Sequence, residues 1–458
     1  MANHNQKLHK ELSLEDQKKL YFRELIDTIF NLEQQGVELD KQKVAQLKNK
    51  LAAKYDIVKP PKDVDVFIFC DVKDLHKLQH LRSKPTRSLS GVAVVAIMTR
   101  PDVCPHGRCV YCPGGLGSPF GDTPQSYTGF EPATRRAIRN NYDSFFQVMN
   151  RLEQYVLGGH DPNKVDLIVM GGTFPSYDIN YQFEFILGVY MAMNKFSELF
   201  YTIVDGKPVL NHVAFKEWFE LPHDVNDRDT EKRLKDKFKK LKEEALAELP
   251  QKATQDDKLE YVKLKNETTA IRCIGLTQET KPDCSLLEHC NRMLTHGTTR
   301  VELGIQTVYN DILRKTARGH TIKHSILATQ ILKDLGFKVN YHMMLGLPGV
   351  DEDKDLESLR EIFKNDDFRP DMIKMYPTLV LPGTPLYERW EKGLYKPIEL
   401  TAAAKIIGQF MAEIPSYVKV MRIQRDIPST LVEGGVQKTN LRQYVEDYMK
   451  EHNLVCTE

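Results

Sequence analysis

Short apolar, β-branched runs alternate with amphipathic stretches through most of this chain. Such runs, separated by helix-like segments, are typical of βα units that build a parallel sheet or barrel. The pattern predicts an α/β fold in which residues 73–398 form a partial (β/α)6 barrel. The six runs expected as strands are 92–98, 165–170, 270–276, 301–305, 339–344 and 372–375.

Helical patterns flank and interrupt the predicted barrel. Residues 12–35 carry apolar side chains at helical spacing, which predicts a helical region over 1–72 that is either a cap or a partner- or RNA-binding module. The charge-rich segment 195–266 predicts a helical insertion on the outside of the barrel, with a scaffold role and an RNA-facing lysine ridge as the alternatives. Residues 399–458 form a C-terminal extension, with helices at 400–414 and 440–453 and a strand at 417–423.

Composition narrows the class of protein. With 41% hydrophobic and 28% charged residues, the chain has the composition of an ordinary globular protein. It has no run of 18 apolar residues and a polar start, which predicts a cytoplasmic protein without a membrane span and with reduced cysteines. The net charge of +1 restricts any nucleic-acid contact to a local patch. The candidate patch for contacting phosphates includes Lys77, Arg82, Lys84 and Arg87. The alternative is that these residues form an ordinary solvated charged face.

Three closely spaced cysteines follow this patch. Cys104, Cys109 and Cys112 have the spacing C-x4-C-x2-C in a chain that is otherwise poor in cysteine, a pattern typical of metal ligands. A plant-type ferredoxin centre needs a fourth cysteine, and the next one is Cys273. A structural zinc site also needs four ligands, and His106 lies inside the tight loop. The pattern therefore favours a [4Fe–4S] cluster with one open iron, while zinc and structural cysteines remain alternatives.

Polar and glycine motifs follow the apolar runs, and in (β/α) barrels functional residues gather at the carboxyl ends of the strands. Backbone groups of Gly171 and Gly172 and the hydroxyl of Thr173 suit an amino-acid-like cofactor. Glu279 and Gln306 suit ribose hydroxyls. Three tyrosines are further candidates, either for stacking on a base or relaying a hydrogen atom, or as plain wall residues: Tyr111, Tyr127 and Tyr376. Lys164 precedes the second run, where a solvated lysine is the default interpretation.

Several motifs together carry a family resemblance. The segments CPHGRCVYCPGG, VMGGTF, ELGIQT and MMLGLPG resemble radical S-adenosylmethionine (SAM) enzymes, whose usual spacing is C-x3-C-x2-C. The departure to C-x4-C-x2-C points to one branch. With IGLTQETKPD, TARGHT and MRIQRDIPSTLVEGGV, the chain from about residue 87 to its end is similar to the catalytic subunits of Elongator, in their archaeal single-protein form.

This resemblance implies an acyltransferase that makes 5-carboxymethyluridine at the wobble position of tRNA. The [4Fe–4S] cluster would cleave SAM to a 5′-deoxyadenosyl radical, which takes a hydrogen atom from the methyl group of acetyl-CoA. The resulting methylene carbon radical would add to uridine C5, and hydrolysis of the thioester would leave the carboxymethyl group. The implied residue roles are cluster ligation by Cys104, Cys109 and Cys112, acetyl-CoA contact by Lys164, SAM binding by Gly171, Gly172, Thr173, Glu279 and Gln306, catalysis by Tyr111 and Tyr376, and tRNA binding by Lys77, Arg82, Lys84 and Arg87.

The resemblance also implies further expectations and leaves alternatives open. Family members continue into a linker, with a zinc site in some, and then into a GNAT-type acetyltransferase domain. This chain ends at Glu458 within what resembles the linker, so we expect that domain and full acetyl-CoA turnover to be missing. The expected partners are tRNA and acetyl-CoA without accessory Elongator subunits, with a homodimer left open. The alternatives are another radical SAM tRNA modifier (although no second three-cysteine set is present), a non-catalytic tRNA-binding scaffold with a structural metal, and a protein lysine acetyltransferase.

Overall fold

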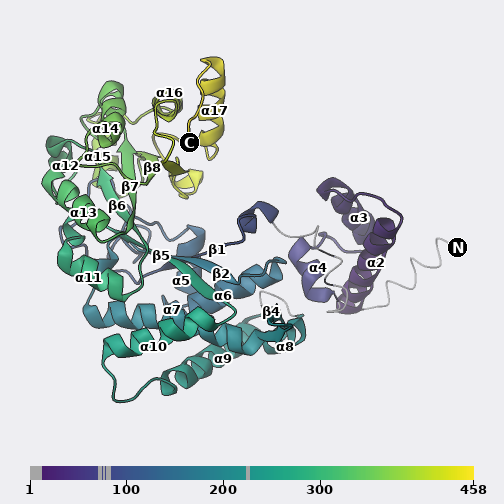
Figure 1. Ribbon diagram of the computed structural model, residues 1–458. Coiled ribbons are helices and arrows are strands. Elements are labelled where there is room, and N and C mark those ends of the chain that lie inside the picture. Colours follow the sequence, from purple (N-terminus) through teal and green to yellow (C-terminus); the bar gives the residue numbers. More distant parts are fainter. Residues whose placement is uncertain (1–12, 71–74, 76–77, 79–83, 223–226) are drawn as a thin grey trace.

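A parallel sheet organises the molecule (Figure 1). The computed structural model describes residues 13–70, 75, 78, 84–222 and 227–458, so Lys77 and Arg82 of the predicted basic patch lie outside the described residues. All six predicted runs are strands of one seven-stranded sheet, and the strand expected at 417–423 is its seventh, which confirms the α/β partial barrel. The sheet order is β1 (Ala93–Met98), β2 (Lys164–Met170), β5 (Arg272–Thr280), β6 (Arg300–Gln306), β7 (Lys338–Leu345), β8 (Met372–Pro377) and β9 (Lys419–Arg422).

Helices surround this sheet and join its strands. None of the described helices is long and apolar enough to cross a membrane. Their bounds are α2 Leu14–Gln34, α3 Lys41–Lys54, α4 Asp63–Phe69, α5 Pro132–Arg139, α6 Ser144–Leu157, α7 Ile179–Phe200, α8 His212–Trp218, α9 Arg228–Ala247, α10 Gln255–Thr268, α11 Leu287–Thr295, α12 Asn310–Lys315, α13 Ile322–Asp334, α14 Glu352–Lys364, α15 Pro385–Glu391, α16 Leu400–Met411 and α17 Leu441–Glu451.

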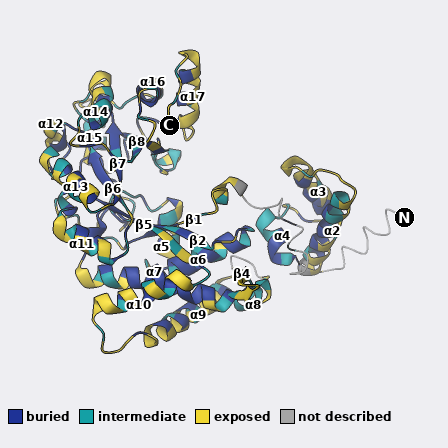
Figure 2. Ribbon diagram, in the orientation of Figure 1, coloured by how far each residue is buried: buried dark blue, intermediate teal, exposed yellow. Residues whose placement is uncertain are grey.

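The strands of the sheet are mostly dark blue, the colour of buried residues, in Figure 2. Along β1 and β2 the burial alternates from residue to residue, so the two faces of the sheet differ. Along β1, Val95 and Ile97 are fully buried against the helices, whereas Val94 on the opposite face is 40% exposed. This alternation is the period-two pattern of a strand with one face in the core. The second face of the sheet therefore remains partly open, and this is the face on which a ligand site can form.

The insertion between β2 and β5 differs from the prediction in two ways. Residues 195–200 belong to α7, which is a helix of the barrel itself, and the insertion begins with a hairpin of β3 (Tyr201–Val204) and β4 (Lys207–Leu210). The charged helix α9 buries Phe238 and Leu241 in the barrel core. Its lysines also form ion pairs, including Lys242 with Asp143 at 2.6 Å. These contacts support the scaffold role of the insertion.

The N-terminal helices α2, α3 and α4 pack around their own apolar core beside the sheet (Figure 1). Phe22 of α2 stacks on Phe69 of α4 with ring centroids 4.2 Å apart. The helical region includes α4 beyond the proline pair at residues 60–61, within the predicted range of 1–72. Lys216 of α8 donates to the carbonyl of Ile68 at 3.0 Å, which connects this region to the insertion. The division into domains at residues 72 and 398 stays a prediction.

The loop that follows β7 is held by a buried carboxyl. Asp355 of α14 is 3% exposed and accepts a hydrogen bond from the amide of Gly346 at 2.6 Å. Burial raises the pKa of Asp355 to about 7, although the Gly346 hydrogen bond opposes this effect. An unfolded aspartate has a pKa of about 3.9, so between roughly pH 4 and pH 7 the folded state binds more protons than the unfolded state. This group therefore makes the free energy of unfolding fall as the pH rises through that window.

We expect Asp355→Asn to remove this pH dependence. The asparagine keeps an acceptor for Gly346, so the variant should gain stability relative to the wild type by at most about 1.4 kcal/mol per pH unit from pH 4 to pH 7. Urea unfolding midpoints across this range measure the effect. Asp353→Asn, an exposed position on the same helix, is the matched control. Parallel pH profiles for wild type and Asp355→Asn would contradict the prediction.

Candidate functional site

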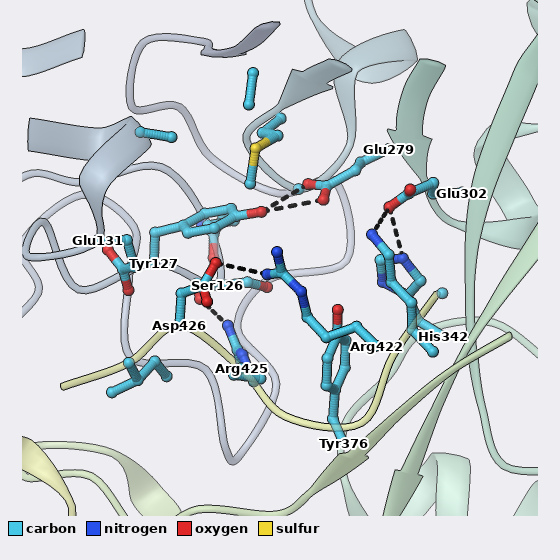
Figure 3. A pocket seen from close by; sticks show the side chains of 18 of the residues that line it. Ser126, Tyr127, Glu131, Glu279, Glu302, His342, Tyr376, Arg422, Arg425 and Asp426 are labelled. Atoms are coloured by element: carbon cyan, nitrogen blue, oxygen red, sulfur yellow. Dashed lines mark hydrogen bonds and ion pairs between the residues drawn. The ribbon is translucent and has the colours of Figure 1, made fainter. Parts of the chain in front are cut away.

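A cavity of about 930 Å³ opens between the carboxyl ends of the strands, the cysteine loop and the segment after β9. In Figure 3, Tyr127, Glu279, Glu302, Tyr376 and Arg422 surround one common space, although they come from separate segments. The cavity is lined by eleven of the residues proposed from the sequence: Cys104, Cys109, Cys112, Tyr111, Tyr127, Gly172, Thr173, Glu279, Gln306, Tyr376 and Arg87.

The cysteine loop is anchored by backbone hydrogen bonds at its centre. The amide of Val110 donates to the carbonyl of Thr316 at 3.1 Å, and its carbonyl accepts from the amide of Leu386 at 2.9 Å. These bonds hold Cys109 and Cys112 on either side of Val110, with both cysteines buried. The loop is therefore fixed in place by tertiary contacts, although it contains no helix or strand between them.

Polar groups approach each of the three sulfur atoms. His106 lies between two of them, with ring nitrogens 3.0 Å from Cys104 Sγ and 3.1 Å from Cys109 Sγ. The amide of Ser126 donates to Cys112 Sγ at 3.3 Å. Burial raises the pKa of the Cys104 and Cys112 thiols. Thiols in such surroundings become thiolates when a metal centre replaces the proton.

The spacing of these atoms tests the zinc alternative. A tetrahedral zinc with Zn–S bonds near 2.3 Å brings its sulfur ligands within about 3.8 Å of one another. Within the described ranges, the set of three metal-binding side chains with ligand atoms within 4.8 Å of one another is Glu279, Glu302 and His342, and no cysteine belongs to it. The three cysteine sulfur atoms therefore do not all lie within 4.8 Å of one another, an arrangement that favours a larger cluster over a single zinc ion.

A buried arginine adds a positive charge beside the cysteines. Arg318 Nη1 lies 3.7 Å from Cys109 Sγ, and Nη2 donates to the Gly304 carbonyl at 3.0 Å. A Cβ on Gly304 would lie 2.4 Å from this guanidinium, so the glycine makes room for it. Burial lowers the pKa of Arg318, but Tyr111 and Cys109 outweigh burial and raise it. A permanent cation at this point suits a negatively charged metal cluster held by the three cysteine thiolates. The sequence reasoning missed Arg318, although it lies within the quoted segment TARGHT.

The glycine pair after β2 serves packing as well as ligand access. A Cβ on Gly171, with φ +134°, would lie 1.9 Å from Thr99 Oγ1, and a Cβ on Gly172 would lie 2.9 Å from Gln125 Cβ. The amide of Gly171 donates to Glu279 at 3.4 Å, and Gly171 does not line the cavity. Gly172 and Thr173 therefore face the cavity, while Gly171 supports them from behind.

Glu279 and Gln306 end their strands at the cavity. Glu279 was predicted to follow its strand, but it is the next-to-last residue of β5. It accepts a hydrogen bond from the Tyr127 hydroxyl at 2.8 Å. Burial and the Glu279 carboxylate raise the pKa of Tyr127, which stays a hydrogen-bond donor. Gln306 is the last residue of β6, at a register irregularity, and has φ +72°. Non-glycine residues in this left-handed region are concentrated at functional sites.

A charged cluster on β6, β7 and β8 forms another part of the wall (Figure 3). Glu302 is 1% exposed, accepts from His342 Nε2 at 2.8 Å and forms an ion pair with Lys374. Burial alone would raise the pKa of Glu302, but Lys374 and His342 outweigh burial and hold it below its usual range. The ring of Tyr376 meets His342 edge to face at 5.6 Å. Sequence reasoning missed this cluster, although its signal was a polar residue inside each apolar run.

Tyr111 lines the cavity, whereas the predicted lysines Lys164 and Lys84 lie outside its lining. The Tyr111 hydroxyl is buried without a hydrogen-bond partner, and burial raises its pKa. Lys164 is the exposed first residue of β2, four residues and about 13 Å along the strand from Ile168, the first residue of β2 that lines the cavity. Lys84 is exposed and lies outside the cavity lining. The structure does not bring these two lysines to the cavity, and their predicted roles stay predictions.

Comparisons with known proteins agree with this geometry. Residues 98–362 match the model of the Radical SAM superfamily, and residues 370–451 match the Radical SAM C-terminal domain. The chain is 41% identical over 443 residues to "tRNA uridine(34) acetyltransferase" of Methanocaldococcus jannaschii, covering 96% of this chain and 71% of the relative. It is 36% identical over 457 residues to "Elongator complex protein 3" of Homo sapiens, covering 98% and 72%. The chain is a radical SAM protein of the Elongator complex protein 3 family.

A solved structure of this Elongator family has the same architecture. The archaeal Methanocaldococcus infernus Elp3 with an N-terminal deletion superposes with a TM-score of 0.58 at 35% identity. The match covers 80% of this chain and 64% of the solved one. Membership of the radical SAM superfamily implies an iron–sulfur cluster and SAM as cofactors. The cysteine loop is the place in the described chain where the donor set suits such a cluster.

Proposed function

We propose that this chain is an enzyme that modifies the wobble uridine of tRNA at C5, with a [4Fe–4S] cluster on Cys104, Cys109 and Cys112. The observation that supports it best is the set of three widely spaced cysteine sulfurs, beside the buried Arg318 cation, in the wall of a large polar cavity. The names of the archaeal relatives support uridine 34 as the position. A bound cluster would supply the electron that cleaves SAM to a 5′-deoxyadenosyl radical.

The strand ends next to the cysteines provide the proposed SAM site. Gly172 and Thr173 bind the amino-acid part of SAM, because they face the cavity and Thr173 Oγ1 lies 3.9 Å from Cys104 Sγ. Glu279 and Gln306 receive the ribose hydroxyls. The hydrogen bond from Tyr127 fixes the orientation of the Glu279 carboxylate before a ligand arrives.

The opposite wall provides the proposed site for the uridine. Tyr376 lines the cavity, and burial raises its pKa, so its hydroxyl keeps its proton at neutral pH and donates a hydrogen bond. Its ring is held edge to face by His342, which offers a flat surface to a base. A cavity of about 930 Å³ suits SAM together with part of a second substrate. Acetyl-CoA is the proposed acyl donor, in keeping with the relatives' names.

The test uses anaerobically reconstituted protein with dithionite, SAM, acetyl-CoA and a tRNA transcript carrying U34. We expect 5′-deoxyadenosine without acetyl-CoA. When acetyl-CoA is present, we expect only a small, substoichiometric amount of 5-carboxymethyluridine by mass spectrometry of the digested tRNA, in line with the weak acetyl-CoA turnover that the sequence predicts. A transcript with C34 is the matched control and should remain unmodified. Protein that holds about four irons per chain yet forms no 5′-deoxyadenosine would favour the scaffold alternative. Equal modification of the C34 transcript would overturn the assignment of the base.

A further inference from the structure

The cavity extends from the cysteine loop to the edge strand β1, where three arginines line it. Arg87 belongs to the short 3-10 helix Pro85–Ser88, Arg136 to α5 and Arg151 to α6. We call these three residues the arginine wall. Three segments that are separate in sequence thus bring cations to one side of the cavity.

The two inner arginines have no acidic partner among the described residues. Arg136 Nη2 donates to the carbonyl of Ala96 on β1. Arg151 Nη1 donates to Gln154 Oε1 at 3.1 Å, and its guanidinium lies 4.5 Å from the ring centre of Tyr155. The Nε atoms of both arginines are buried without a hydrogen-bond partner. Both guanidinium groups therefore carry N–H donors that no described group uses.

The hydrogen bond to Ala96 gives Arg136 a structural role, because the guanidinium satisfies a carbonyl of the edge strand β1 that has no partner strand on that side. That role uses one nitrogen of Arg136 and explains neither Arg151 nor Arg87. Arg136 and Arg151 are half-buried and Arg87 is exposed, so the cost of gathering these like charges is partial desolvation together with their mutual repulsion. Burial and the neighbouring Arg151 lower the pKa of Arg136 to about 9. An anion bound between these side chains would offset both costs.

We propose that the arginine wall binds a phosphate group of the nucleotide substrate whose reacting end lies at the cysteine loop. Guanidinium groups bind phosphate through paired, charge-assisted hydrogen bonds. Phe130, which is 50% exposed and lines the same cavity, offers a ring face for a nucleobase beside that phosphate. The proposal rests on the function proposed above. The phosphate belongs either to the RNA backbone or to coenzyme A, and both have the same chemistry at this wall.

The test compares wild type with the double variant Arg87→Gln/Arg151→Gln, which leaves the Arg136 contact to β1 in place. Arg135→Gln is the matched control, because Arg135 is exposed on α5 and does not line the cavity. One arm measures the Kd of a fluorescent anticodon stem-loop RNA at several salt concentrations, and the other arm measures the Kd of coenzyme A. Equal melting temperatures verify that the variants are folded.

For whichever ligand supplies the phosphate, RNA or coenzyme A, we expect the Kd of the double variant to rise about tenfold for each lost contact. For RNA, the slope of log K against log salt should become shallower by about 0.7, the value for one lost phosphate contact on single-stranded RNA. The control should bind like wild type. A change for RNA alone assigns the phosphate to the RNA backbone, and a change for coenzyme A alone assigns it to the acyl donor. Unchanged affinity in both arms would overturn the arginine wall, while failure of wild type to form 5′-deoxyadenosine would instead reject the proposed function.

Discussion

Replacing Cys109 with serine is expected to reduce 5′-deoxyadenosine formation to the level measured without protein. Cys109 is the middle cysteine of the proposed ligand set in sequence, and its Sγ lies 3.1 Å from His106 Nε2 and 3.7 Å from Arg318 Nη1. A serine hydroxyl keeps the volume but loses the soft thiolate that iron–sulfur clusters require. The iron content per chain should fall together with the activity. Anaerobic iron analysis and mass spectrometry of 5′-deoxyadenosine measure the two effects on the same sample.

Cys290→Ser is the matched control for this prediction. Cys290 is also fully buried, but its thiol donates to the carbonyl of Ser285 at 3.3 Å in the hydrophobic core, a bond that a serine hydroxyl can replace. This variant should keep both iron and activity. Normal 5′-deoxyadenosine from Cys109→Ser would contradict the cluster assignment. One zinc and no iron in the wild type would instead restore the zinc alternative.

The parts of the site that sequence predicted are those that local spacing determines. The cysteine triad lies within nine residues, and the glycine and polar motifs directly follow apolar runs. Because parallel strands end at one edge, these motifs had to meet there. The same reasoning did not fix the purpose of each residue. Gly171 was predicted to face a cofactor, yet its missing side chain makes room for Thr99, and its amide serves Glu279.

The residues that sequence missed depend on strand register and helix rotation. Glu302, His342 and Lys374 come from three strands, and only the observed pairing places them on one face within hydrogen-bonding distance. The two inner members of the arginine wall depend in the same way on how α5 and α6 turn toward β1. The prediction for Lys164 depended on the same information. Its strand was predicted correctly, but Lys164 is the first residue of β2 and lies at the end away from the cavity. Hydrophobic periodicity and sequence motifs predict the helices and strands, whereas the direction in which each side chain points follows only from the packed structure.

Replacing Lys374 with methionine is expected to lower the free energy of unfolding by about 3 kcal/mol. The variant would leave the Glu302 carboxylate, which is 1% exposed, with only the polar contacts of His342 at 2.8 Å and Asn340 at 3.3 Å. Lys338→Met is the matched control on the neighbouring strand. Lys338 pairs with Asp371 at 3.2 Å but its side chain is 65% exposed, so its loss should cost less than about 1 kcal/mol. Denaturant unfolding midpoints compare the two.

The pH dependence and a double variant identify the cause of that loss. Because the folded-state pKa of Glu302 lies below its unfolded value, its ion pair contributes stability above roughly pH 4.3, which is lost as the pH falls through the folded value. The difference between wild type and Lys374→Met should therefore shrink on acidification. Adding Glu302→Gln to Lys374→Met removes the buried charge and should recover most of the lost stability. A double variant no more stable than Lys374→Met would show that lost packing, rather than an unpaired carboxylate, causes the destabilisation.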